Sequence, residues 1–214
     1  MTDLHRALVN FLEHDFSITE IDHIAWTEAE PVSIDRYWSG RAAPAARHAE
    51  ANLLWSSNAF YVRFEALQSE ALIISNNPDR SRKAVGLWDR DVCEIFVAAG
   101  SDACRKYLEF EVAPTGEWVD LAIEFQAGER RSDLSYSSGM QAFSRMENDK
   151  VISAIMIPWT AFGKTPKPGD LWRGNLFRCV GDGPERGYLA WQPTLTEIPN
   201  FHVPEKFGEF SFVD

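Results

Sequence analysis

Residues 107–114 read YLEFEVAP, and this alternation of apolar and acidic side chains decides the fold class. Successive side chains of a β-strand point to opposite faces, so Leu108 and Phe110 share one face of the strand. Glu109 and Glu111 share the other face. An apolar face backed by a polar one is typical of a strand in an antiparallel sheet with one buried side.

Similar short runs recur along most of the chain, separated by clusters of Gly, Pro, Asn and Asp. We expect strands at 17–26, 51–55, 59–66, 71–75, 92–98, 107–113, 118–123, 140–145, 151–158, 171–180, 188–191 and 207–213. Many short strands at this spacing indicate a sandwich or barrel rather than a parallel α/β sheet. We therefore predict one all-β domain over residues 17–214.

The remaining segments have other patterns. Residues 1–16 place Leu4, Leu8, Phe11 and Leu12 at helical spacing, which predicts a short N-terminal helical extension. The Ala- and Arg-rich stretch 38–52 predicts a loop with a helical turn.

The composition limits the classes of partner. The chain has 214 residues, a formal net charge of −11 and a sequence pI near 4.9. Nucleic acids and anionic membranes attract basic surfaces, so neither is the expected partner. Eight of the residues are tryptophan. Because an indole is large and its N–H needs a partner, we expect most of them in the core and a minority facing a ligand.

No signal peptide is visible at the start of the sequence, and no window approaches the roughly 18 apolar residues of a membrane span. We expect a cytoplasmic protein if the chain is complete. Cys93 and Cys179 sit in apolar, strand-like runs and Cys104 does not, and none forms a CxxC pair. Buried reduced thiols are expected at the first two, with one disulfide plus one free thiol as the alternative.

One carboxylate stands out from the solvated ones. In DVCEIFVA (91–98), Glu94 shares a strand face with Val92 and Phe96. A carboxylate between large apolar neighbours must reach a cleft, pair with a cation or bind a ligand.

Six segments carry a resemblance to a known family. They are LWDRDVCEIFVA (87–98), RKYLEFEVAPTGEWVD (105–120), IPWTAF (157–162), PKPGDLWRGNLFRC (166–179), LAWQP (189–193) and FHVPEKFGEFSF (201–212). The motif residues are Trp88, Asp91, Glu94 and Phe96 in the first segment, and Gly169, Trp172, Arg173, Asn175 and Arg178 in the fourth. In this order the segments resemble carbohydrate-binding module family 9, from near Trp26 to Phe212.

The resemblance implies a jelly-roll-like antiparallel β-sandwich of about ten strands. It also implies a site that holds a mono- or disaccharide, often the reducing end of a plant polysaccharide, between two aromatic rings. The chemistry is reasonable, because the C–H-rich face of a pyranose packs on an aromatic ring while carboxylates, amides and guanidinium groups bind its hydroxyls.

In this resemblance Trp88 matches the first stacking aromatic and Glu94 matches the acid that binds hydroxyls. The alternative is that Trp88 caps the end of the sandwich while Glu94 pairs with Arg178. Glu109 and Glu111 join the site if their strand lies beside that of Glu94, although ordinary solvated carboxylates are an equal alternative. Arg178 either binds a hydroxyl or pairs with a buried glutamate.

The second aromatic wall is where the sequence departs from the family pattern. Trp191 is the first candidate and Phe201 the second. His202 is a candidate polar contact, with an exposed loop histidine as the alternative.

The last expectations concern metal binding and catalytic activity. The family often carries structural calcium, and Asp79, Asp89 and Asp91 are acidic loop residues, but no D-x-D-x-D-G loop is present and no ligands are assigned. No cofactor is expected to be required. The sequence contains no hydrolase motif, so we expect a non-catalytic domain that assists a glycoside hydrolase in polysaccharide catabolism. The rival hypotheses are a sandwich that serves another ligand or a protein partner, and a haem-binding redox domain.

Overall fold

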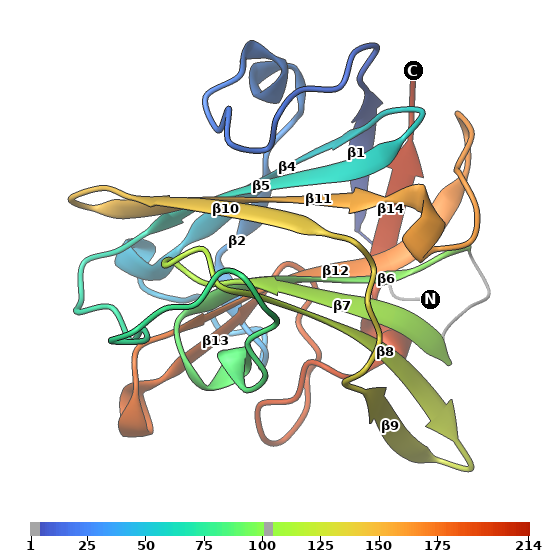
Figure 1. Ribbon diagram of the computed structural model, residues 1–214. Coiled ribbons are helices and arrows are strands. Elements are labelled where there is room, and N and C mark those ends of the chain that lie inside the picture. Colours follow the sequence, from blue (N-terminus) through green and yellow to red (C-terminus); the bar gives the residue numbers. More distant parts are fainter. Residues whose placement is uncertain (1–4, 101–104) are drawn as a thin grey trace.

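The computed structural model describes residues 5–100 and 105–214, and it is built almost wholly of strands (Figure 1). The strands are β1 (Arg6–Phe11), β2 (Val32–Ile34), β3 (Arg36–Tyr37), β4 (Ala49–Trp55), β5 (Ala59–Leu67), β6 (Val92–Ala98), β7 (Lys106–Val112), β8 (Trp118–Gln126), β9 (Glu129–Asp133), β10 (Gln141–Met146), β11 (Lys150–Pro158), β12 (Leu171–Val180), β13 (Gly187–Ala190) and β14 (Gly208–Phe212). Short 3₁₀ turns lie at Ile24–Glu28, Ala45–Arg47, Leu87–Asp89, Trp159–Ala161, Gly183–Glu185 and Pro204–Lys206.

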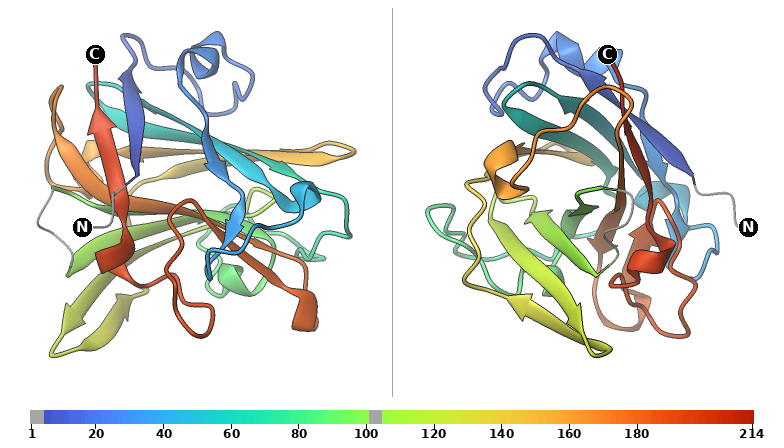
Figure 2. Two further views of the ribbon diagram at one scale, coloured as in Figure 1. Left: turned by 180° about the vertical axis from the view of Figure 1, so that it is seen from behind. Right: turned by 90° about the vertical axis from the view of Figure 1, so that its right-hand side faces the viewer.

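The strands form two layers. In Figure 1 the upper layer contains β10, β11, β5 and β4 in that order, with β2 beside β4. The lower layer runs β14, β12, β6, β7, β8 and β9, with β13 and β3 beyond β12. We call these the first and second sheets. Strand β1 connects them, because Arg6–Val9 pairs in parallel with β14 and Asn10–Phe11 pairs in parallel with β4 (Figure 2, left).

The main core lies between the two sheets. It contains the apolar residues of alternate strand positions, including Phe64, Ile95, Phe110 and Trp172, all of which are almost fully buried. Phe110 therefore points inward as its alternation predicts. The all-β sandwich prediction is confirmed, and the number of strands exceeds the expected ten because β1, β2, β3 and β9 are additional short strands.

A second apolar cluster lies on the outer face of the second sheet. It is formed by the strand positions that alternate with the main core, together with residues of the loops that cover them. Its members include Leu87, Val92, Phe96, Tyr107, Val119, Leu121, Phe177, Cys179, Phe201 and Phe207. Both faces of β6 and β7 are therefore largely buried. The candidate site lies on this outer face.

The predicted N-terminal helix is wrong. Residues 6–11 form β1, in which Ala7 and Val9 are buried, while Leu8 and Phe11, two members of the presumed helical stripe, are exposed. Pairing with two neighbouring strands satisfies the backbone hydrogen bonds that a helix would otherwise supply. Residues 1–4 of the expected helix lie outside the described residues.

Two further segment predictions are wrong, and one exposed strand was not predicted. Residues 17–26 and 71–75 form no strand, and 129–133 is a strand that the sequence pattern did not reveal. Residues 12–29 instead cover the outer face of the first sheet, where Ile21 and Trp26 are buried. Strand β9 has the sequence ERRSD and is exposed throughout, so it carries no apolar alternation to detect.

The structure also bears on the expectations for the cysteines and for membrane-spanning segments. Cys93 and Cys179 are buried free thiols, as predicted, whereas Cys104 lies outside the described residues. Among the described residues, no helix is both long enough and apolar enough to cross a bilayer.

Candidate functional site

A pocket of about 510 Å³ opens on the outer face of the second sheet. Its residues come from the floor strands β6, β7, β8 and β12, from β13, from the segment before β6, from β9 and the residue after it, and from the loop that precedes β14. They are Val85, Trp88, Asp89, Glu94, Phe96, Glu109, Leu121, Arg130, Ser132, Leu134, Cys179, Tyr188, Pro199, Asn200, Phe201 and His202. The volume is within the range of small-ligand sites, and the lining combines apolar and aromatic side chains with polar ones, as such sites do.

Three glutamates meet at the floor of this pocket. Register places Glu94 of β6 directly opposite Glu111 of β7, and Phe96 opposite Glu109. The exposed fractions of Glu94, Glu109 and Glu111 are 2%, 3% and 0%. One carboxylate oxygen from each lies within 4.8 Å of the other two. We call these three residues the glutamate cluster.

Few partners reach the glutamate cluster. The Cys179 thiol donates to Glu94 Oε1 at 3.4 Å. Among the described residues, Glu109 Oε2 and both carboxylate oxygens of Glu111 have no hydrogen-bond donor. Buried carboxylates without donors are costly, because neither water nor a dipole stabilises their charge.

The surroundings of the glutamate cluster raise its pKa values. Burial raises the pKa of Glu94 to about 8, and the charge of Glu109 adds to this. Burial likewise raises the pKa of Glu109 to about 7. The pKa of Glu111 is raised by burial first and then by its two neighbours. The cluster therefore retains protons near neutral pH unless a cation replaces them.

Trp88 stands in the turn that precedes β6. Its side chain is 36% exposed, lines the pocket and packs on no other aromatic ring among the described residues. The turn begins at Gly86, whose φ of +85° favours glycine. Leu87 anchors the turn in the apolar cluster on the outer face of the second sheet, which we call the outer cluster.

Arg186 holds this turn from the opposite side. Its guanidinium donates to the carbonyl oxygens of Trp88 (2.8 Å), Arg90 (2.7 Å) and Gly181 (2.7 Å), and it lies over the ring of Tyr188. The partly exposed indole is thus carried by a turn whose carbonyl groups are held in place, which suits a ring that stacks on a ligand.

Phe201 and His202 line the pocket from the loop before β14. The ring of Phe201 stacks on Phe177 with centroids 4.0 Å apart, and its exposed fraction is 8%. The ring of His202 stacks on Phe96, and its Nδ1 shares a hydrogen bond of 2.7 Å with the Tyr107 hydroxyl. Burial and the charge of Arg130 lower the pKa of His202 to about 3, so the imidazole is neutral.

Six of the eight candidate residues meet at this site. Five of them line the pocket and Glu111 lies at its floor, within the glutamate cluster. The five are Trp88, Glu94, Glu109, Phe201 and His202. Their roles in ligand binding remain predictions.

The structure does not bring Trp191 to the pocket. Its ring stacks on Phe210 between the sheets, with centroids 5.7 Å apart and planes only 9° from parallel. Its neighbour Ala190 belongs to the outer cluster, so strand alternation directs the indole the opposite way. Gly208 permits this position, because an added Cβ would lie 2.5 Å from the Trp191 ring.

Arg178 is also directed away from the pocket. Its neighbours on β12, Phe177 and Cys179, occupy the outer face, so the guanidinium points between the sheets. There it donates to the carbonyl oxygens of Arg47 and His48 and to Gln68. These bonds correct the expectation that Arg178 either pairs with a buried glutamate or binds a hydroxyl in the pocket.

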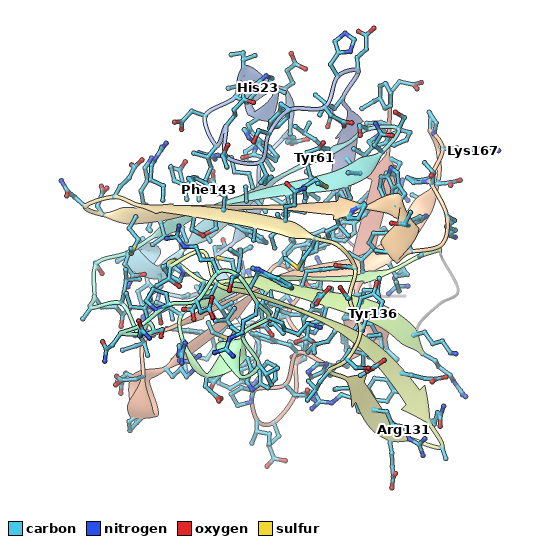
Figure 3. All side chains as sticks on the ribbon, viewed as in Figure 1. His23, Tyr61, Arg131, Tyr136, Phe143 and Lys167 are labelled. Atoms are coloured by element: carbon cyan, nitrogen blue, oxygen red, sulfur yellow. The ribbon has the colours of Figure 1, made fainter. Side chains whose placement is uncertain are left out.

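The sequence analysis missed several pocket residues, among them Arg130, Ser132, Tyr188 and Asn200. Arg130 and Ser132 belong to β9, beside Arg131, which is labelled in Figure 3. No pattern in the exposed ERRSD segment singles them out.

Two of the three acidic loop residues considered for calcium, Asp91 and Asp79, have partners within the protein. Asp91 accepts hydrogen bonds from the backbone N–H groups of Gly181 and Ile73. Asp79 accepts from Ser81 and pairs with Arg82. Asp89 lines the pocket.

Comparison with known proteins agrees with this architecture. A putative carbohydrate-binding protein from Bacteroides uniformis ATCC 8492 superposes with a TM-score of 0.75 at 16% identity, covering 98% of this chain and all of the other. A carbohydrate binding module family 9 from Caldicellulosiruptor kristjanssonii, in complex with cellotriose, gives 0.69 at 19% identity, with 98% and 94% covered. The same module with glucose gives 0.67 at 19% identity, with 97% and 95% covered.

These identities show a shared fold, and no curated protein matches the sequence. The family assignment comes from the sequence itself. The model of the family described as "Carbohydrate family 9 binding domain-like" matches residues 19–214, which is most of the chain. The chain therefore belongs to the carbohydrate family 9 binding domain-like family.

Proposed function

We propose that the pocket on the outer face of the second sheet binds the end of a mono- or oligosaccharide without cleaving it. The observation that carries the proposal is the exposed, unstacked indole of Trp88 beside buried carboxylates in one pocket. The indole offers a flat apolar surface to the C–H face of a pyranose, and the floor and rim offer polar groups to its hydroxyls.

The polar groups are suited to hydroxyl recognition. Carboxylates accept hydrogen bonds from hydroxyls, Arg130 donates, and the Asn200 amide does both. Phe201 supplies the second aromatic surface, although its ring stacks on Phe177 and is only 8% exposed. The sugar is therefore held mainly by one open wall, Trp88.

The choice of sugars to test follows from the relatives. The structures of the Caldicellulosiruptor module contain cellotriose and glucose, so glucose and β-linked gluco-oligosaccharides are the first probes. A module that binds such ends assists an enzyme that degrades the same polysaccharide, and we propose this accessory role for the chain. No specific observation favours either rival function. The His202 Nδ1 is hydrogen-bonded to Tyr107, and no methionine is among the described pocket residues, which leaves no axial pair for haem.

The test is isothermal titration of the protein with glucose, cellobiose, cellotriose and xylobiose. Trp88→Ala is compared with Phe11→Ala, which removes an aromatic ring of similar exposure (40%) from β1, outside the pocket. Burying about 80 Å² of the exposed indole at about 25 cal/mol/Å² is worth about 2 kcal/mol. We therefore expect about 30-fold weaker binding in Trp88→Ala and unchanged binding in the control.

Two results would count against the proposal. One is that none of the four sugars binds the wild-type protein. The other is that Trp88→Ala, folded by circular dichroism, binds as tightly as wild type. Release of product from chromogenic glycosides, lost in Glu94→Gln, would contradict the non-catalytic assignment.

A further inference from the structure

No arginine or lysine of the described residues forms an ion pair with the glutamate cluster, although the more distant charges of Arg130 and Arg186 act on Glu109 and Glu94. Among the described residues, the one ion-pair partner within reach is His202, whose Nδ1 lies 4.0 Å from Glu109 Oε2. That nitrogen shares a hydrogen bond of 2.7 Å with the Tyr107 hydroxyl, and 4.0 Å is too long for a hydrogen bond to Glu109.

The side chains around the three carboxylates are mostly apolar and do little to stabilise their negative charge. Apolar residues such as Val119, Leu121 and Phe96 lie beside the glutamate cluster on the same outer face of the second sheet. Glu111 is fully buried, and neither of its oxygens accepts a hydrogen bond from another residue that the structure describes. A buried carboxylate without a hydrogen-bond donor must either bind a proton or lie next to a positive charge.

We propose that Glu94, Glu109 and Glu111 bind a hard divalent cation, of the calcium, manganese or magnesium class, at the floor of the pocket. Calcium takes carboxylate oxygens at roughly 2.3–2.6 Å, so ligand oxygens around it lie up to about 5 Å apart. The oxygens of the glutamate cluster lie within 4.8 Å of one another, which meets that requirement.

The donor set determines the class of metal. Three carboxylates are hard ligands that suit calcium, magnesium and manganese rather than copper or zinc. The nearby Cys179 thiol does not change this, because its sulfur donates to Glu94 Oε1 at 3.4 Å and does not belong to the group of converging ligand atoms. A soft thiolate ligand is therefore not offered.

The arrangement leaves one side of the cation open. Glu94 and Glu109 line the pocket, whereas Glu111 lies fully buried at its floor. Three protein ligands fall short of the six to eight oxygens that calcium prefers, so the remaining positions face the pocket and take water or hydroxyl groups of a bound molecule. The cation site itself does not depend on the proposed sugar binding.

The test is calorimetric titration of chelator-treated protein with CaCl₂, MnCl₂ and MgCl₂ in turn. The variant is Glu111→Gln, which keeps the size and shape of the side chain but removes its charge. The matched control is Glu129→Gln, because Glu129 is an exposed glutamate on β9 of the same sheet. Circular dichroism establishes that each protein is folded, and Mn²⁺ electron paramagnetic resonance counts the sites.

We expect one site per chain for at least one of the three metals, weakened about tenfold or more in Glu111→Gln and unchanged in Glu129→Gln. Two results would overturn the inference. One is that no metal binds the folded wild-type protein, which would mean that protons alone balance the cluster. The other is equal binding in Glu111→Gln. Sugar binding that depends on Trp88 can be present or absent in either case, so the two proposals fail separately.

Discussion

Replacing Glu111 by glutamine should stabilise the metal-free protein. Two unit charges 4.8 Å apart repel by about 3 kcal/mol at an effective dielectric constant of about 20. Three ionised carboxylates in the glutamate cluster would cost about 10 kcal/mol, which is comparable with the whole stability of a typical domain. At least one of them therefore keeps a proton near neutral pH, in agreement with the raised pKa values of Glu94 and Glu109.

The pH dependence follows from the direction of these shifts. A carboxyl whose pKa is raised by folding contributes stability that is fully present below its unfolded pKa and is lost as pH rises through its folded pKa. For Glu109 and Glu94 this interval runs from the ordinary value of 4.5 to about 7 and about 8. The metal-free wild-type protein should thus lose stability across this interval, and Glu111→Gln should lose less of it because one charge is absent.

The assay is urea unfolding in the presence of a chelator at about pH 5 and about pH 8. Since protonation already relieves part of the repulsion, we expect Glu111→Gln to exceed wild type by about 2 kcal/mol at the higher pH and by little at the lower. A variant less stable than wild type at the higher pH, or one with the same advantage at both, would refute this electrostatic account. Glu129→Gln serves again as the control.

The remaining predictions concern the turn that presents the indole and the packing between the sheets. Arg186→Ala should weaken sugar binding about fivefold, because its charged hydrogen bond to the Trp88 carbonyl is lost, while the midpoint of thermal unfolding changes little; unchanged titration isotherms would contradict this. Gly174→Ala should destabilise the fold by about 3 kcal/mol, because the added Cβ would lie 2.6 Å from the Phe96 carbonyl oxygen and against the ring of Phe210. Urea unfolding measures that loss, and a change below about 1 kcal/mol would contradict the packing argument.

The alternation of residues 107–112 was enough to predict which side chains of β7 share a face. It could not reveal that loops cover the second face as well, and this coverage is what buries Glu111 completely. A sequence pattern reports polarity, whereas burial depends on which distant segments lie above the strand. Glu109 and Glu111 are therefore the residues whose surroundings differ most from the ordinary expectation for such a strand.

The aromatic wall illustrates the same limit. Trp191 and Phe201 both precede the final strand, and residue type alone favoured the indole. The register of β13 against β12 directs Ala190 outward and Trp191 inward, and this register is set by tertiary pairing. The prediction of a helix in place of β1 was wrong for a related reason. The residues with which β1 pairs, in β4 and β14, lie 40 or more positions away in the sequence.

The central claim, a carbohydrate pocket walled by Trp88, is tested most directly by following the indole N–H signals of the eight tryptophans by nuclear magnetic resonance during titration with cellobiose. Trp88→Phe identifies the signal of that residue. The account predicts that the Trp88 signal moves furthest with saturable dependence on cellobiose, while that of Trp191, which lies between the sheets, stays in place. A fixed Trp88 signal together with a moving signal from Trp191 would contradict it.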